Sequence, residues 1–589
     1  MKNTDDNKQS FWNKVSCTHK KLAGKYKELD SIITILGVMV FGSTVVTLCN
    51  SGTNTKAEVK ASLTNNKAEE YFFQGEYSKA ISEYQKMQSG QEWPYYEAKL
   101  AEVYSASGDI NRSNELLDEV VKKRVNLITQ NGIDQYKSGD AELGCLVSYL
   151  SYLNGNNKAL EYAKSFYEDN MDDFNMNIMM FTLYLQQGDK ESARNILNNL
   201  YENDKEKSAY ELAVLSKMYI TLQDNSKGLE ILKEAWEEDK NDLKVYDIVS
   251  EITSSSINNL LSEIEQLSKD NEDEPCYKVW LLKHYSEDSM SSSKYNDLKN
   301  EIYSEKVESY VVELIEQGFF KGADNDKIKQ IIEKLERKED PTYSDENIIA
   351  TYYKNKGNNS KALEYAAKSV NSNRDYDKNY IDNIPNSTKA KSDNVRVESY
   401  YRQAISTEPF NGDAILELAD YYKNELSNNE KAYEFYEIAE KIEPDSAEII
   451  YNMAMIKFED KDINEGIELI NKCISLDPNE AKYHRALGKA YYDIGKKDEV
   501  INEIRKAYKN DNDDIVALNN AGCYYISIGN DIDRGLYNLK CAYEMIKSVD
   551  DLKVKKVIIA NYEAAKEVKK SSGNDVSTTV NPLLFEMLY

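Results

Sequence analysis

Small side chains recur at a nearly constant interval among the larger apolar and polar residues of 404–542. Within one series the steps are 35, 34, 34 and 35 residues, and two further series keep the same interval. The three series are Ala404, Ala439, Cys473, Ala507 and Ala542; Ala419, Ala454, Gly488 and Gly522; and Pro409, Pro444 and Pro478. A period of about 34 residues accommodates two short antiparallel helices and two turns, which bury an apolar face only when stacked. The pattern therefore predicts a stack of helical hairpins.

The unit 481–514 shows the motif behind this period most completely. Its motif residues are Leu487, Gly488, Tyr491, Gly495 at the turn, Ile504 and Ala507, with His484 and Val500 as departures. This spacing resembles the tetratricopeptide repeat, in which W-x2-L-G-x2-Y is followed by A-x3-F and P. The resemblance covers 397–548 and implies an all-α fold, an α-solenoid in which helix–turn–helix repeats form a superhelix. It implies no single function, because this scaffold hosts many.

Weaker forms of the same motif divide the rest of the chain. Motif residues begin again at Ala68, so we expect an N-terminal array over 60–244. The motif fades over 245–342, which keeps only the apolar spacing of amphipathic helices and is interpreted as degenerate helical repeats. It returns in a second array over 343–548. Within that array, 381–396 is rich in Pro, Asn and Ser, which predicts a flexible break.

Two features follow the last expected repeat. Residues 549–570 combine apolar positions with a lysine-rich face, which predicts a helix that caps the stack. Over 571–589 a flexible polar linker leads to the apolar sequence PLLFEMLY. Such an end segment either folds into a groove of its own molecule or docks on another one, and the sequence leaves both alternatives open. Its shortness excludes a second membrane span.

The first fifty residues predict a membrane anchor. The segment 1–30 is polar and carries seven lysines against four acidic residues, and 31–49 contains nineteen residues without a charge. As a helix this stretch is about 28 Å long, close to the thickness of the hydrocarbon core. The alternatives are a buried core helix, which normally keeps a polar stripe, and a cleaved signal peptide, whose A-x-A site does not follow. We therefore expect one transmembrane helix at 31–49.

Charge orients this predicted helix and excludes one class of ligand. Seven lysines precede 31–49 and only three follow it within twenty residues. This bias predicts a cytoplasmic segment 1–30 and an extracytoplasmic repeat region. The net charge of −28 and the pI near 4.8 argue against a nucleic-acid partner.

No residue pattern in the sequence indicates catalysis, a metal site or a cofactor. The three histidines are far apart in the chain, and the sequence has no Gly-rich phosphate loop, H-E-x-x-H or C-x-x-C. We therefore expect a non-enzymatic protein without a cofactor, with an enzyme hidden in 245–342 as a remote alternative. Among seven cysteines, only Cys523 and Cys541 fall on the two helices of one predicted repeat, where a disulfide is conceivable.

The resemblance to the tetratricopeptide repeat also selects a binding surface. In that family, positions 2, 5, 6, 9, 12 and 13 of the first helix of each repeat line a concave groove. In three consecutive units these positions include Tyr451, Asn452, Met455 and Phe458; Lys482, Arg485, Lys489 and Tyr492; and Asn519 and Asn520. Lys and Arg can hold a carboxylate, and Asn can hold an extended backbone. The alternative is a solvated helix face with i,i+4 ion pairs.

These features lead to one functional hypothesis and one principal alternative. The hypothesis is a membrane-anchored scaffold that binds peptide segments or partner proteins through its concave surface, in the assembly of an envelope or surface complex. The alternative is a cytoplasm-facing regulator or assembly chaperone with the inverted topology.

Overall fold

A computed structural model describes residues 66–203, 205–254, 260–288, 293–305, 307–390, 396–548, 551–572 and 584–589. Within these residues every regular element is a helix or a short helical turn, so the all-α fold expected from the sequence is confirmed there. No helix of the described part combines the length and the apolar character that a bilayer crossing requires. The predicted anchor at 31–49 and the basic segment 1–30 lie outside the described residues.

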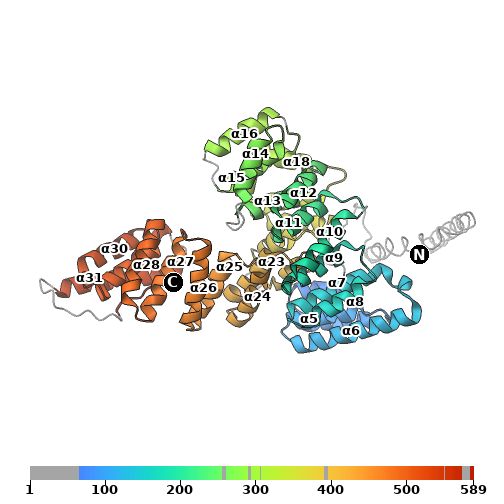
Figure 1. The fold of residues 1–589 in the computed structure, drawn as a ribbon, viewed down its shortest axis with the longest axis horizontal. Helices are drawn as coiled ribbons and strands as arrows, with labels where there is room; N and C mark the ends of the chain where they lie inside the picture. Colours follow the sequence, from blue (N-terminus) through green and yellow to red (C-terminus); the bar gives the residue numbers. More distant parts are fainter. Residues whose placement is uncertain are drawn as a thin grey trace, which may run out of the picture. The chain divides into compact units, whose positions relative to one another are not determined.

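The first described part of the chain consists of consecutive antiparallel helix pairs (Figure 1). The helices are α3 (Lys67–Phe73), α4 (Tyr77–Gln88), α5 (Tyr95–Ala106), α6 (Ile110–Asn131), α7 (Lys137–Leu153), α8 (Ala159–Tyr167), α9 (Phe174–Gln186), α10 (Lys190–Glu202), α11 (Ala209–Thr221) and α12 (Asn225–Glu238), with a 3₁₀ turn at Ile133–Gln135. Each odd-numbered helix packs on the even-numbered helix that follows it. This succession of hairpins is the arrangement of a solenoid.

Helices continue through the stretch in which the sequence motif fades. They are α13 (Leu243–Ser254), α14 (Leu260–Asp270), α15 (Pro275–Asp288), α16 (Ser293–Glu305), α17 (Tyr310–Glu316) and α18 (Asp326–Leu335), with a 3₁₀ turn at Phe319–Lys321. The pairing is less regular here, since α15 contacts α13, α14, α16 and α17. Amphipathic spacing without the repeat motif thus still gives helices, but not strict hairpins.

The region 343–446 contains helices that π turns interrupt. They are α19 (Tyr343–Asn355), α20 (Asn359–Ser372), α21 (Ile384–Lys389), α22 (Glu398–Thr407), α23 (Gly412–Asp420) and α24 (Asn429–Ile442), with π turns at Asn379–Asn383 and Tyr421–Glu425. The flexible break expected at 381–396 is therefore wrong for its first part. Ile384 is fully buried, so hydrophobic packing orders a segment whose composition favours a loop.

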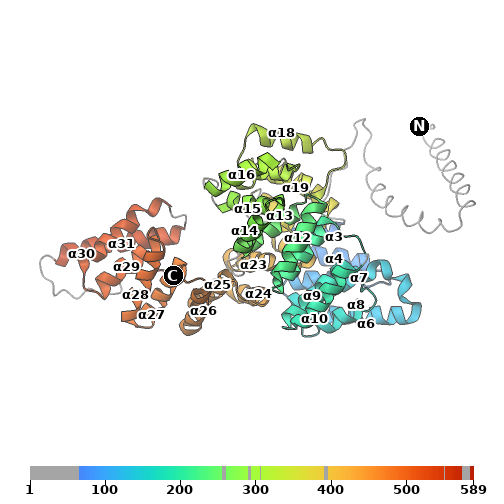
Figure 2. The same ribbon diagram turned by 45° about the horizontal axis from the view of Figure 1, so that its top comes forward.

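The last repeats follow one another as regular hairpins (Figure 2). Their helices are α25 (Ala447–Glu459), α26 (Ile463–Leu476), α27 (Ala481–Asp493), α28 (Lys497–Asn510), α29 (Ile515–Ser527), α30 (Ile532–Glu544) and α31 (Leu552–Ser572), with a 3₁₀ turn at Ile546–Ser548. Helix α31 packs on α29 and α30. It therefore covers the apolar face that the last hairpin would otherwise expose.

The turn inside each hairpin requires a left-handed backbone. Gly495, between α27 and α28, has φ of 76°, and Lys461 has φ of 66° at the equivalent position between α25 and α26. Glycine adopts this conformation without steric conflict, whereas a side chain with a Cβ atom does so at a cost in free energy. The turn glycine of the sequence motif, Gly495 in this unit, thus marks the hairpin turn, and Lys461 occupies the equivalent turn less favourably.

Small residues allow the two helices of a hairpin to approach closely. A Cβ atom built on Gly522 of α29 would lie 2.9 Å from the carbonyl oxygen of Gly535 in α30. A Cβ atom built on Gly535 would lie 2.8 Å from the carbonyl oxygen of Gly522. The two backbones are therefore in direct contact at this crossing, as the small-residue series predicts.

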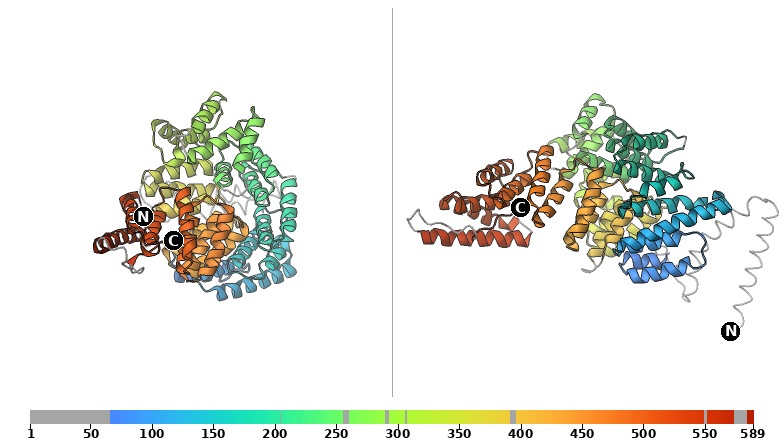
Figure 3. Two further views of the ribbon diagram at one scale, coloured as in Figure 1. Left: turned by 60° about the vertical axis from the view of Figure 1, so that its left-hand side comes forward. Right: turned by 60° about the horizontal axis from the view of Figure 1, so that its bottom comes forward.

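Helix α22 packs against the helices at the start of the described chain (Figure 3). The rings of Phe73 and Tyr400 stack with centroids 4.8 Å apart. The hydroxyl of Ser399 donates to the carbonyl oxygen of Phe72 over 3.0 Å. As a result, one continuous hydrophobic core extends from Ala68 to Ile456, whereas the later repeats have separate smaller clusters.

Ion pairs are buried within this continuous core. The ammonium of Lys244 lies 2.8 Å from Asp377 and also contacts Glu408, and all three side chains are buried. The guanidinium of Arg402 lies 2.7 Å from Glu398 and is 1% exposed. Charged groups this deep are stable only when paired. The Lys244 pairs join segments more than 130 positions apart. Arg402 and Glu398, in contrast, pair within α22, and Arg402 reaches the early helices through a hydrogen bond to Ser105.

Candidate functional site

The last described residues of the chain, 584–589, form a segment that we call the tail. The tail lies against α27, α29 and α31 of its own chain, and its backbone is held by asparagine side chains. The side-chain amide of Asn520 donates to the carbonyl oxygen of Leu588 over 2.6 Å. The oxygen of the same amide accepts from the N–H of Leu588 over 2.8 Å. One asparagine thus satisfies both backbone groups of one tail residue.

The same arrangement recurs two residues earlier in the tail. Asn561 of α31 donates to the carbonyl oxygen of Glu586 over 2.7 Å and accepts from its N–H over 3.0 Å. Asn519 donates to the same carbonyl oxygen over 3.2 Å. In an extended chain the N–H and C=O groups of residues i and i+2 point to the same side. The tail therefore has the hydrogen bonds of an edge strand, but three asparagine side chains take the place of the backbone of a neighbouring strand.

These three asparagines belong to one buried polar network. Asn561 donates to the oxygen of Asn519 over 2.9 Å, and Asn519 donates to Asn520 over 3.2 Å. Asn519 and Asn520 are 0% exposed. A buried amide without a partner costs roughly 1–3 kcal/mol. The network therefore needs a backbone beside it, and the tail supplies one.

The ring of Tyr589 occupies a site between α25 and α27. It stacks on Phe458 with centroids 4.4 Å apart and planes inclined by 11°. The ammonium of Lys489 lies 4.7 Å from the ring centroid, and the hydroxyl donates to Asp493. Burial, with the Asp493 carboxylate, raises the pKa of Tyr589 well above its usual value. This end of the groove therefore suits a neutral aromatic hydroxyl.

The structure brings part of the predicted binding surface together around the tail. Phe458, Lys489, Asn519 and Asn520 contact it directly. Met455 and Tyr492 belong to the apolar clusters that include Tyr589 and Phe585, respectively.

The other predicted residues are engaged elsewhere. Arg485 is paired with Asp514 over 2.5 Å, and Lys482 lies over the rings of Tyr451 and Tyr483. Lys489 itself is paired with Asp493 over 2.6 Å, and Asn452 is half-buried on α25. Two of the three cations expected to hold a carboxylate, Arg485 and Lys489, are therefore already paired with an acid of this chain, and asparagines make the hydrogen bonds to the tail backbone.

Two residues that hydrogen-bond to the tail backbone were not in the predicted set. Asn561 lies on the helix expected as a cap, where it is the polar member of a buried row with Ile558 and Ala565. A buried-face position occupied by Asn was the signal that could have revealed it. The thiol of Cys523 donates to the carbonyl oxygen of Glu586 over 3.6 Å. Cys523 and Cys541 are both free, so the conceivable disulfide between them is not formed.

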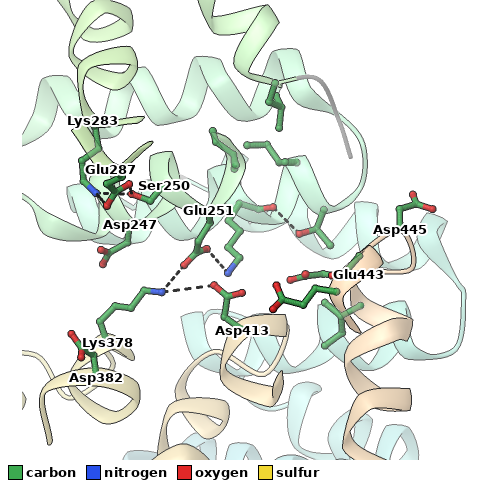
Figure 4. A pocket seen from close by; sticks show the side chains of 18 of the residues that line it. Asp247, Ser250, Glu251, Lys283, Glu287, Lys378, Asp382, Asp413, Glu443 and Asp445 are labelled. Carbon is green, nitrogen blue, oxygen red and sulfur yellow. Dashed lines mark hydrogen bonds and ion pairs between the residues drawn. The ribbon is translucent and has the colours of Figure 1, made fainter. Parts of the chain in front are cut away.

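A second candidate is a cavity of about 780 Å³ between earlier helices (Figure 4). Lys378 lies 3.0 Å from Glu251 and 3.9 Å from Asp413, and Lys217 lies 2.7 Å from Glu251. Burial, with Asp413 nearby, raises the pKa of Glu443 to about 7. These ion pairs join α11, α13 and α23 across the cavity, so we interpret the cluster as structural.

The described residues offer no metal site and use His484 structurally. Within the parts that the structure describes, no three His, Cys, Asp or Glu side chains are grouped to hold a metal ion. The ring nitrogens of His484 contact Glu503 at 2.7 Å and the carbonyl oxygen of Pro478 at 2.9 Å. This histidine therefore links α27 to α28 and to the preceding turn.

Comparison with known families identifies one of the repeats. Residues 447–480 match the family model of the tetratricopeptide repeat. This match covers α25 and α26, the hairpin that supplies Phe458 to the tail. The described chain is thus an α-helical solenoid in which one repeat matches the tetratricopeptide repeat. Among curated proteins, none matches the sequence.

Solved structures match this chain at low identity and low TM-score. The hetero-tetramer Cut9–Hcn1 of the APC/C is 14% identical, covers 85% of this chain and 95% of its own, and has a TM-score of 0.34. Yeast Tom70 is 13% identical, covers 87% and 96%, and has a TM-score of 0.34. YrrB, described as a tetratricopeptide-repeat protein with an unusual peptide-binding site, is 16% identical, covers 35% and 97%, and has a TM-score of 0.26.

Proposed function

We propose that this protein is a scaffold that binds an extended segment of a partner protein through the groove formed by α25, α27, α29 and α31. The observation that carries the proposal is the pair of hydrogen bonds between Asn520 and the backbone of Leu588. Asn561 repeats it at Glu586. Hydrogen bonds to a backbone are independent of side-chain identity, so the groove accepts the extended backbone of another chain in the same way.

The surroundings of these asparagines support the same proposal. Apolar clusters flank the network on α28, α29 and α31 and supply the contact area that two amides alone lack. Hydrogen bonds fix the register of an extended segment, and apolar contacts supply most of its affinity. No catalytic step is needed for this activity.

A selection from a displayed peptide library tests the proposed function. The target is the full chain with Phe585→Glu and Met587→Glu, which remove the tail from the groove, because the tail is itself hydrogen-bonded to Asn520. Enriched peptides are measured by titration against three proteins: this chain, and the same chain with Asn520→Ala or with Asn452→Ala. We expect Asn520→Ala to weaken binding about tenfold, since it removes two hydrogen bonds. Asn452 occupies the equivalent position of α25, so Asn452→Ala is the matched control. Peptides that bind all three proteins equally would place the interaction outside this groove.

We further propose that 31–49 anchors the protein in a membrane and that the repeats serve the assembly of an envelope complex. The uncharged run of nineteen residues and the lysines that precede it support this part of the proposal. Carbonate extraction of membranes tests the anchor, which is refuted when the chain is released. Protease treatment of intact cells tests the orientation, because an extracytoplasmic repeat region is degraded. A protected repeat region would instead favour the inverted topology of a cytoplasm-facing regulator or assembly chaperone.

A further inference from the structure

The tail presents its side chains to the groove in an alternating pattern. Phe585 and Met587 are buried in one apolar cluster with Val500, Ile504 and Cys523. Glu586, between them, is exposed. This alternation is that of an extended strand with one face against the protein. The groove thus buries the side chains at the first and third positions of the tail segment 585–589, and the side chain at the second position remains in solvent.

The last two residues of the tail use separate apolar sites. Leu588 is buried in a cluster with Leu518, Ala542 and Ile558. The ring of Tyr589 lies against Phe458 and donates its hydroxyl to Asp493. Four side chains of the tail therefore have defined environments, and the backbone between them is held by asparagines.

We propose that the tail occupies the groove in competition with the partner segment. We further propose that the order of apolar and polar side chains in the tail specifies which segments can replace it. This inference rests on the proposed function. The partner carries bulky apolar residues at positions 1, 3 and 4 of an extended stretch, any polar residue at position 2 and an aromatic residue at position 5. A segment of this class satisfies the asparagines and fills the same apolar sites as the tail.

The contacts of the tail are of a kind that another chain can reproduce. The hydrogen bonds that Asn519, Asn520 and Asn561 make to the described tail residues go to the backbone of Glu586 and Leu588. These hydrogen bonds would be equally satisfied by any extended backbone in the same register. Capping of the repeat stack does not depend on the tail, because α31 packs on both helices of the last hairpin. Removal of the tail therefore opens the groove without removing the cap.

The connection to α31 favours the tail over a free segment of the same sequence. Eleven residues, 573–583, join the end of α31 to the tail. A ligand tethered by a short linker has an effective concentration on the order of millimolar. For a free segment that binds the empty groove with a dissociation constant of about 10–100 μM, competition by the tail therefore raises the apparent dissociation constant roughly tenfold to a hundredfold. The groove is thus closed to weak ligands and open to a partner that binds more tightly.

A fluorescent peptide of sequence PLLFEMLY tests this inference by titration against the full chain. The double substitution Phe585→Glu and Met587→Glu, which places two charges in an apolar cluster, releases the tail. Glu586→Gln is the matched control, because that side chain is exposed. We expect the doubly substituted chain to bind the peptide at least tenfold more tightly than the unaltered chain, and Glu586→Gln to behave as unaltered. Hydrogen exchange of α27–α31 verifies that the repeats remain folded, and Tyr589→Ala, a milder change, should give an intermediate gain.

The other outcomes each overturn a defined part of the argument. Equal affinities for the unaltered and the doubly substituted chains would refute the competitor while leaving the peptide-binding groove intact. Binding to neither chain, with the repeats folded and the tail released, would refute the proposed function as well. A dimer that forms with increasing concentration of the unaltered chain, and that the double substitution abolishes, would assign the groove to the tail of a second copy and refute competition within one chain.

Discussion

The side chain of Asn520 and the backbone of Leu588 form two hydrogen bonds, of 2.6 and 2.8 Å, across 68 positions of the sequence. Such a pair of contacts is specific for an extended backbone, because both backbone groups of one residue must face the same way. It is the contact on which the proposed peptide groove depends most directly.

Substitution of Asn520 should release the tail. Asn520→Ala removes both hydrogen bonds to Leu588, and each contributes about 1 kcal/mol to docking. We expect amide exchange at 586–589 to accelerate roughly tenfold or more, while exchange in α27 remains slow. The control Asn452→Ala alters the equivalent position of α25, whose side chain makes no hydrogen bond to the described residues of the tail. An unchanged exchange rate in Asn520→Ala would show that apolar contacts alone hold the tail.

The contact between Gly522 and Gly535 should tolerate no added methyl group. Gly535→Ala places a Cβ atom 2.8 Å from a backbone oxygen, so the helices must separate. We expect the free energy of unfolding of the last repeats to fall by about 1–3 kcal/mol in urea titrations. Gly488→Ala is the milder comparison, because its Cβ atom would lie 3.2 Å or more from its neighbours. A larger effect at Gly488 than at Gly535 would contradict this description of the crossing.

The turn at Lys461 offers a stabilising substitution. Lys461→Gly relieves a left-handed conformation at φ of 66°. We expect the free energy of unfolding to rise by about 1 kcal/mol. The reverse change at the equivalent turn, Gly495→Lys, should lower it by a similar amount. Thermal unfolding followed by circular dichroism measures both variants, and a destabilised Lys461→Gly would show that the lysine side chain contributes more than its backbone costs.

Burial of Glu443 gives stability a pH dependence of known sign. Its pKa is raised from 4.5 to about 7 in the folded protein, so the folded state binds more protons than the unfolded state between these values. The contribution of Glu443 to stability should therefore be fully present below about pH 4.5 and be lost as the pH rises to about 7. Glu443→Gln should remove this contribution, whereas the exposed Glu448→Gln should not. Urea titrations of the three proteins give the free energy of unfolding at pH 5 and pH 8. An equal change in this free energy between the two pH values for Glu443→Gln and the unaltered chain would refute this assignment.

Loss of Arg402 should destabilise the contact between α22 and the first helices. Arg402→Ala leaves the buried carboxylate of Glu398 without its cation, which costs about 3–5 kcal/mol. The effect should appear as faster amide exchange in both α22 and α3, because the two helices share one core. Arg505→Ala, at an exposed position of α28, is the control. Faster exchange in α22 without a change in α3 would contradict the shared core.

The sequence predicts the local structure of the repeats well for a physical reason. A hairpin depends on contacts between residues fewer than about 35 positions apart, so its small residues and turn glycines recur visibly. Asn519 and Asn520 could be placed on the inner surface because position within a repeat determines which side chains face the groove. The contacts of Phe458 and Lys489 follow from the same register.

The remaining features depend on contacts that produce no repeating pattern in the sequence. The pairing of Arg485 with Asp514, and of Lys489 with Asp493, turned two expected ligand-binding cations into intramolecular partners. Asn561 was missed because its helix was interpreted only as a cap. The packing of Tyr400 on Phe73 joins residues more than 320 positions apart. No pattern within either helix announces such a partner.

Because α22 completes the core that α3 begins, part of the apolar surface of the first hairpin stays uncovered early in synthesis. A growing chain presents Phe72 and Phe73 on the ribosome long before their partners on α22 have been translated. In most solenoids each repeat contacts only its neighbours and can fold as soon as it emerges. Here this apolar surface is covered only after about 330 further residues have been translated, which takes roughly 20 to 60 s at ordinary elongation rates. Nascent chains of this protein should therefore depend on chaperones that shield apolar surface until translation passes α22.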